Sequence, residues 1–86
     1  MSATRERHEK LSGRLADLAP GGRGIVRRLS GEPKILRRLM ELGFVPGTQV
    51  ELVRRAPMGD PIELRIRDTH FSLRRSEANR IDVDPI

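Results

Sequence analysis

The stretch that decides the fold runs from Arg38 to Gly47 and reads RLMELGFVPG. Its first half carries apolar residues at the spacing of one buried helical face. Gly43 follows as a residue that readily takes the left-handed conformation with which many helices end. Val45-Pro46-Gly47 then predicts a type II turn, because proline suits its second position and glycine its third. These ten residues therefore predict a helix end followed at once by a change of direction.

The helix that ends at this stretch is predicted to begin at Glu32. Pro33 suits the first helical position, and a carboxylate at Glu32 is favourable at the positive end of the helix dipole. Apolar residues recur at intervals of three and four, as a buried helical face requires; they are Ile35, Leu36, Leu39, Met40 and Leu42. We therefore expect one amphipathic helix over residues 32–42.

Outside this helix, the apolar pattern has the period of two that is typical of half-buried strands. Inward positions such as Ile62, Leu64 and Ile66 alternate with charged ones. Five short strands are predicted, over residues 24–29, 48–55, 62–67, 70–73 and 81–83. The sequence thus predicts a mainly β protein, a small and partly closed barrel whose helix covers one end.

Turn residues separate the predicted strands. Ala19-Pro20-Gly21-Gly22 precedes the first strand, and residues 56–61 (APMGDP) form a hairpin loop between the second and the third. Residues 76–79 predict a single helical turn with Ser76 as its N-cap. Asp84-Pro85 is expected to end the last strand.

The length of 86 residues is compatible with one domain and a thin core. Leu, Ile, Val and Phe account for 23 of the 86 residues, above the roughly 20% below which disorder is expected. We expect a mobile charged leader over residues 1–13 and a single domain over 14–86. No cysteine, signal peptide or long apolar run is present, so we expect a cytoplasmic protein without disulfides and without membrane insertion.

The charge leaves two interpretations open. The chain carries 15 Arg and 2 Lys and a formal charge of +5, which favours either a nucleic-acid binder or a soluble domain with an arginine-rich surface. Proteins that bind single strands stack bases on aromatic rings, and the only aromatic side chains are Phe44 and Phe71. Nucleic acid is therefore the less favoured partner.

The inventory of chemically active side chains predicts no catalytic residue, no cofactor and no metal site. The only histidines are His8, in the predicted leader, and His70, on an outward strand position. Asp60 together with Asp68 or Asp84 would give at most a weak oxygen site, and their spacing matches no known metal loop. An enzyme is not expected.

The order of the turn motifs is more specific than any one of them. In sequence they are Leu15-x-x-Leu18-x-Pro20-Gly21, Gly24-x-Val26-x-x-Leu29, Arg38-Leu39-x-x-Leu42-Gly43-x-x-Pro46-Gly47, Pro57-x-Gly59-Asp60-Pro61-Ile62, Leu73-Arg74-x-x-x-Ala78 and Ile81-x-Val83. This series resembles the FeoA family, the small cytosolic proteins of bacterial ferrous iron transport. The charged leader and the arginine excess depart from a minimal member.

The resemblance implies an SH3-like β-barrel with an inserted helix. It also implies an accessory or regulatory protein of ferrous iron transport, which binds the cytosolic part of the FeoB transporter and is recruited through it to the inner membrane. The alternative is a basic nucleic-acid-binding or iron-regulatory module, since a related SH3-like domain ends some iron-dependent repressors. Open strand edges would also permit a homodimer.

Two candidate partner surfaces follow from the residues. Met40 and Phe44, beside Arg37 and Glu41, are expected to lie half exposed, because the helix has more apolar positions than a narrow stripe needs. The alternative interpretation places both Met40 and Phe44 in the core. The second candidate surface is the hairpin tip, formed by Met58, Gly59 and Asp60.

Overall fold

The computed structural model describes residues 13–86, so the predicted leader, except for Gly13, lies outside the described residues. The elements follow in the order β1 (Gly13–Arg14), η1 (Leu15–Asp17), β2 (Arg23–Leu29), α2 (Pro33–Leu42), β3 (Gln49–Arg55), β4 (Ile62–Ile66), β5 (Thr69–Leu73), α3 (Arg75–Ala78) and β6 (Ile81–Pro85). The predicted mainly β class with one longer helix and one short helical turn is confirmed.

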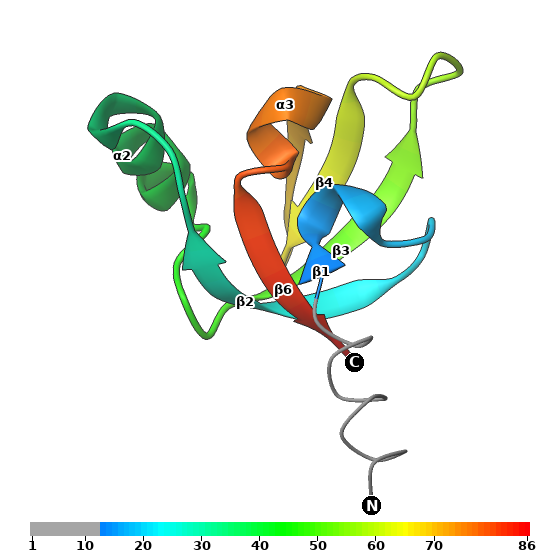
Figure 1. Cartoon of the computed structure of the whole chain (residues 1–86). Coiled ribbons are helices and arrows are strands. Elements are labelled where there is room, and N and C mark those ends of the chain that lie inside the picture. The colour runs from blue at the N-terminus through cyan, green and yellow to red at the C-terminus, as the bar shows by residue number, and fades with distance from the viewer. Residues whose placement is uncertain (1–12) are drawn as a thin grey trace, which may run out of the picture.

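All six strands form one antiparallel sheet in the order β1-β6-β2-β3-β4-β5. The sheet curls around the core without closing, and α2 lies beside it, beyond the end of β2 (Figure 1). The strand that the sequence did not predict is β1, whose two residues pair with Val83 and Asp82 of β6. A two-residue strand carries no periodic signal, so only its partner makes it recognisable.

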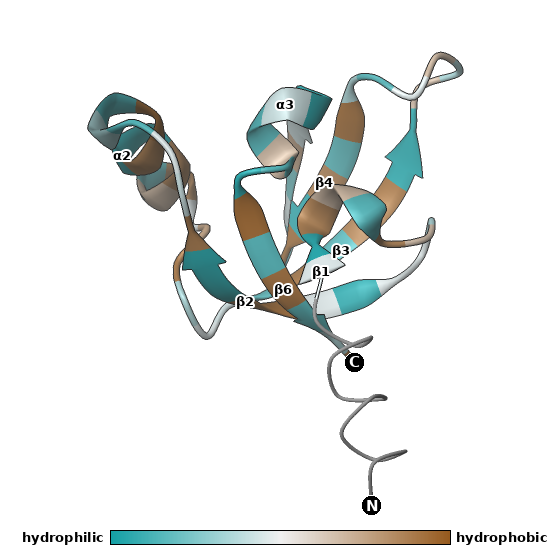
Figure 2. Ribbon diagram, viewed as in Figure 1, coloured by the Kyte–Doolittle hydropathy of each residue, from teal (hydrophilic) through white to brown (hydrophobic). Residues whose placement is uncertain are grey.

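The core lies on the concave side of the sheet. Apolar and polar residues alternate along β4 and β6 in Figure 2, as the period of two predicted. Ile62, Leu64 and Ile66 of β4 are buried, while Arg65 between them is exposed. Leu39 is the buried residue of α2, and Ile35 and Leu42 pack against the core from the same helix.

The turn that the opening motif predicted is present. The Thr48 N–H donates a hydrogen bond to the Val45 carbonyl at 3.0 Å, and Gly47 has φ of 95°, which agrees with the third position of a type II turn. This turn leads directly into β3.

The C-terminal strand is longer than predicted, because β6 continues through Asp84 to Pro85. The prediction that Asp84-Pro85 ends the strand is therefore wrong. Strand β1 pairs only with Asp82 and Val83, so β6 has no neighbour on that side beyond Val83. A proline is tolerated there, since its missing N–H removes no ladder hydrogen bond from an unpaired edge.

Candidate functional site

The C-terminus of α2 determines which of its apolar residues face outward. The Gly43 N–H donates to the Met40 carbonyl at 3.0 Å, and the Phe44 N–H donates to the Leu39 carbonyl at 3.1 Å. With Gly43 at φ of 112°, this is a Schellman motif, in which the residue after the glycine packs against the helix. Phe44 and Leu39 are accordingly both fully buried.

The expectation that Phe44 lies half exposed is therefore wrong. Its ring is 0% exposed and lies 5.5 Å, centroid to centroid, from that of Phe71. Phe44 therefore lies beneath the outer surface of α2 and is not part of that surface. The Gly43-Phe44 pair already contained the signal, because an apolar residue after a helix-ending glycine commonly makes this contact.

The outer side of α2 forms a shallow apolar hollow. Pro33, Leu36, Arg37, Met40 and Glu41 line it, and the Met40 side chain is 48% exposed. The structure thus brings together Arg37, Met40 and Glu41, as the sequence predicted.

A second hollow adjoins the first and shares Leu36 and Met40 with it. Its other lining residues come from β2 and from the loop after α2; they are Arg27, Arg28, Leu29 and Pro46. We call the apolar members of the two hollows (Pro33, Leu36, Met40, Leu29 and Pro46), together with Arg37 and Glu41, the α2 face. The sequence does not predict Leu29 and Pro46 here, because they lie on segments other than α2, and it predicts Leu36 on the buried face of the helix, whereas Leu36 is only partly buried.

The hairpin tip is a different kind of surface. Met58 is 91% exposed, and Gly59 closes the turn with a hydrogen bond from its N–H to the Ala56 carbonyl at 2.7 Å. The tip and α2 lie at opposite ends of the molecule (Figure 1), so the two predicted groups of partner residues do not form one surface.

Asp60 has a structural partner of its own. One of its carboxylate oxygens, Oδ1, accepts a hydrogen bond from the backbone N–H of Arg75 at 3.0 Å. The Arg74 N–H donates to the Glu77 carboxylate at 3.0 Å. These two contacts satisfy N–H donors at the start of α3. The N-cap position is Arg74, so the predicted cap at Ser76 is wrong. The carboxylates of Asp60 and Glu77 accept these hydrogen bonds in place of a capping hydroxyl.

Five arginines, four on strands and one on α2, form ion pairs with nearby acids. Ion pairs join Arg27 to Asp84, Arg28 to Asp82, Arg54 to Glu63, Arg65 to Glu51 and Arg38 to Glu77. These five arginines therefore face acids on neighbouring elements, whereas nucleic-acid binding uses uncompensated basic side chains gathered on one face. The structure therefore gives no support to the nucleic-acid alternative.

Two of the aspartates considered for a weak oxygen site have protein partners. Asp60 accepts from Arg75, and Asp84 pairs with Arg27. Among residues 13–86, no group of three or more His, Cys, Asp or Glu side chains is placed to hold a metal ion. In the same part of the chain, no helix is long and apolar enough to cross a membrane.

Comparison with known proteins now identifies the family. The FeoA domain model matches residues 13–85. A Porphyromonas gingivalis protein, the Fe(2+) transport protein A/Fe(2+) transporter FeoB fusion protein, is 38% identical over 73 residues, which cover 85% of this chain and 9% of that protein. The present chain therefore spans only a small part of that relative.

Solved structures agree with the match. A FeoA protein from Chlorobium tepidum is 41% identical, with a TM-score of 0.77 over 83% of this chain and 68% of that one. A zinc complex of Stenotrophomonas maltophilia FeoA, described as a procaryotic SH3 domain protein, is 37% identical, with a TM-score of 0.73 over 83% and 88%. The SH3-like fold predicted from the sequence is confirmed, and the chain belongs to the FeoA domain family.

Proposed function

We propose that this protein is a cytoplasmic accessory protein of ferrous iron transport that binds the cytosolic part of a FeoB-type transporter through its α2 face. One observation carries the proposal: in the Porphyromonas gingivalis relative, an FeoA sequence and a FeoB transporter are parts of one chain. Two units that are fused in one protein work side by side, so separate chains of the same families are expected to associate.

The chemistry of the α2 face supports its role as the docking surface. Met40 is half exposed. Methionine has a flexible side chain, which makes it common on binding surfaces. Leu36 and Pro33 extend the apolar area beside it, while Arg37 and Glu41 supply a polar rim. An apolar centre with a charged rim is the usual anatomy of a specific protein interface.

The surface is small, which implies a transient complex. Weak signalling and regulatory complexes bury less than about 1,200 Å² in total, and one short helix face fits that range. The protein then acts by docking and not by catalysis, and recruitment by the transporter places it at the inner membrane.

Isothermal titration of the full chain against the purified cytosolic part of FeoB tests the proposal. We expect saturable binding by the wild type and a loss of about tenfold or more in Met40→Asp, since the new carboxylate would be buried in an apolar contact. Met58→Asp is the matched control, because it places the same charge at an exposed methionine at the other end of the molecule.

Two results would overturn the proposal in different ways. Absence of binding by the wild type up to millimolar concentration would remove the transporter as partner. Normal binding by Met40→Asp together with loss in Met58→Asp would keep the partner and move the docking surface to the hairpin tip.

A further inference from the structure

The turn between β4 and β5 contains an unusual backbone conformation. Arg67 has φ of 55°, and it is the only residue other than glycine with positive φ among residues 13–86. The left-handed region is unfavourable for an ordinary side chain, and glycine, asparagine or aspartate occupies it more readily. The two-residue hairpin between Ile66 and Thr69 requires the positive φ, but it does not require an arginine there.

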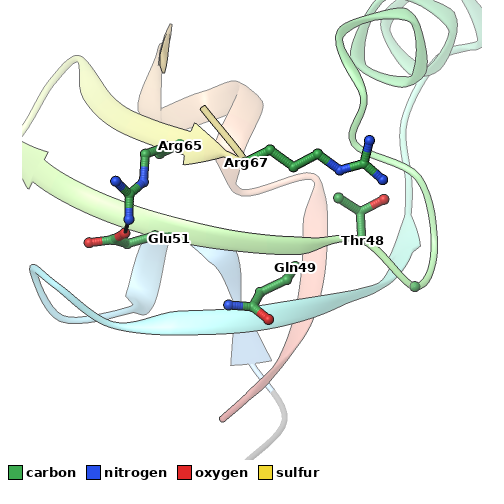
Figure 3. Close-up of a pocket in the computed structure, with 6 residues that line it drawn as sticks. Thr48, Gln49, Glu51, Arg65 and Arg67 are labelled. Atoms are coloured by element: carbon green, nitrogen blue, oxygen red, sulfur yellow. Dashed lines mark hydrogen bonds and ion pairs between the residues drawn. The ribbon is translucent and has the colours of Figure 1, made fainter. Parts of the chain in front are cut away.

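The Arg67 side chain borders a polar hollow. Gly47, Thr48, Gln49, Glu51 and Arg65 line the hollow with it. Figure 3 shows the guanidinium of Arg67 extending toward Thr48 and the loop that precedes β3. The space at Gly47 is open, since a methyl group built there would meet no atom within 4 Å.

Neighbouring arginines on the sheet differ from Arg67 in having a carboxylate. Arg65 donates to Glu51 at 2.5 Å, and Arg54 donates to Glu63 at 2.5 Å. Within the described part of the chain, Arg67 makes no side-chain hydrogen bond or ion pair. It is therefore a cation beside the Thr48 hydroxyl (Figure 3), and Gln49 lines the same hollow.

We propose that this hollow binds a carboxylate, with the Arg67 guanidinium as the charged donor and the Thr48 hydroxyl as a neutral donor. Charge decides the ligand class. Two arginines and one glutamate line the hollow, which leaves one uncompensated positive charge. A monoanion brings the site to zero net charge, whereas a phosphate dianion would leave an excess negative charge beside Glu51. A planar carboxylate further matches the fork of a guanidinium.

The natural source of this carboxylate is an Asp or Glu side chain of the protein that covers the α2 face. Pro46 lines the α2 face and Gly47, the next residue, lines the hollow. We therefore expect a segment that lies across the α2 face to reach Arg67 with one acidic residue. This assignment of the source rests on the proposed function, whereas the site itself does not.

The site is tested first with acetate as the probe. Amide chemical shifts of the full chain are followed while sodium acetate replaces sodium chloride at constant ionic strength. We expect saturable shifts at Thr48, Gln49 and Asp68 with an apparent affinity of roughly 100 mM. They should be absent in Arg67→Gln and retained in Arg80→Gln, which removes an exposed arginine of another turn.

Three outcomes would overturn the site. Wild-type shifts that are equal in acetate and chloride would show that no carboxylate binds. Unchanged acetate binding by Arg67→Gln would remove Arg67 as the donor. Tighter binding of inorganic phosphate than of acetate would replace the carboxylate by another ligand class.

Arg67→Gly tests whether the strained backbone is kept for binding. Glycine relieves the left-handed strain, so we expect the melting temperature to stay level or rise, by up to about 4–8 °C, while acetate binding is lost. A lower melting temperature would mean that the Arg67 side chain stabilises the fold, which would overturn this interpretation.

Titration with the cytosolic part of FeoB then tests the source of the carboxylate. We expect Arg67→Gln to bind about fivefold more weakly than the wild type and Arg80→Gln to bind normally. Equal binding by Arg67→Gln would overturn the docking source. Acetate binding without any FeoB binding would instead remove the proposed partner and leave the site intact.

Discussion

The α2 face and the hairpin tip each present an exposed methionine, but their surroundings are opposite. Met40 lies among Leu36, Pro33 and Pro46, which form a continuous apolar area. Met58 is more exposed, yet it extends from a turn of glycine, proline and aspartate. A single exposed apolar side chain is ordinary in soluble proteins, whereas a contiguous patch marks an interaction surface. We therefore propose the α2 face as the interaction surface, because its exposed methionine lies within a contiguous apolar area and Met58 lies in a short turn.

The two regions also differ in the contacts that stabilise them. The α2 face rests on Phe44 and Leu39, which are buried under the helix end. The hairpin tip is tied to α3 by the hydrogen bond from the Arg75 N–H to Asp60. We therefore expect mutations beneath the α2 face to cost far more stability than mutations at the tip.

The largest effect is expected for Phe44→Ala. Removing a buried ring leaves a cavity, and we expect the free energy of unfolding to fall by about 3–5 kcal/mol. Urea denaturation followed by circular dichroism measures it, with Phe44→Leu as the control that keeps most of the volume. A loss below about 1 kcal/mol would mean that Phe44 does not support the helix.

A moderate effect is expected for Asp60→Ala. This change leaves the Arg75 N–H at the start of α3 without its acceptor, and we expect a loss of about 1 kcal/mol in unfolding free energy. Asp60→Asn keeps an oxygen acceptor in the same place and should retain most of that stability. Equal losses in both variants would show that the hydrogen bond is not what ties the tip to α3.

A smaller effect is expected for Arg38→Gln. Arg38 forms an ion pair with Glu77, which joins α2 to α3, and exposed pairs contribute about 0.2–1 kcal/mol. We expect the loss in unfolding free energy to shrink in 1 M NaCl because salt screens the pair. A double-mutant cycle with Glu77→Gln isolates the pair, and a coupling energy of zero at low salt would contradict this link.

The smallest effect is expected for Met58→Ala. The side chain is almost fully exposed, so its truncation should change the unfolding free energy by less than about 0.5 kcal/mol. Chemical denaturation beside the wild type measures it. A larger loss would show that the hairpin tip is packed against the rest of the domain and would erase the contrast between the two regions.

The sequence by itself determined the elements whose causes are local. Period, turn residues and the helix-ending glycine predicted α2, the type II turn at 45–47 and the strands other than β1, because each depends on residues adjacent in the chain. The ordered series of motifs also identified the family. For the candidate site, it selected Arg37, Met40 and Glu41 from the excess of apolar positions on one helix.

The tertiary structure decided whatever depends on residues distant in the chain. Strand β1 exists because β6 pairs with it, and the first residue of α3, Arg75, donates its N–H to Asp60 in a loop 15 residues earlier. Leu29 and Pro46 join Met40 only when three segments meet. Arg67, which follows β4, extends toward Thr48, which precedes the neighbouring strand β3 (Figure 3). The spacing of residues along the chain does not predict such contacts, because they form only when the packing of the core brings distant segments together.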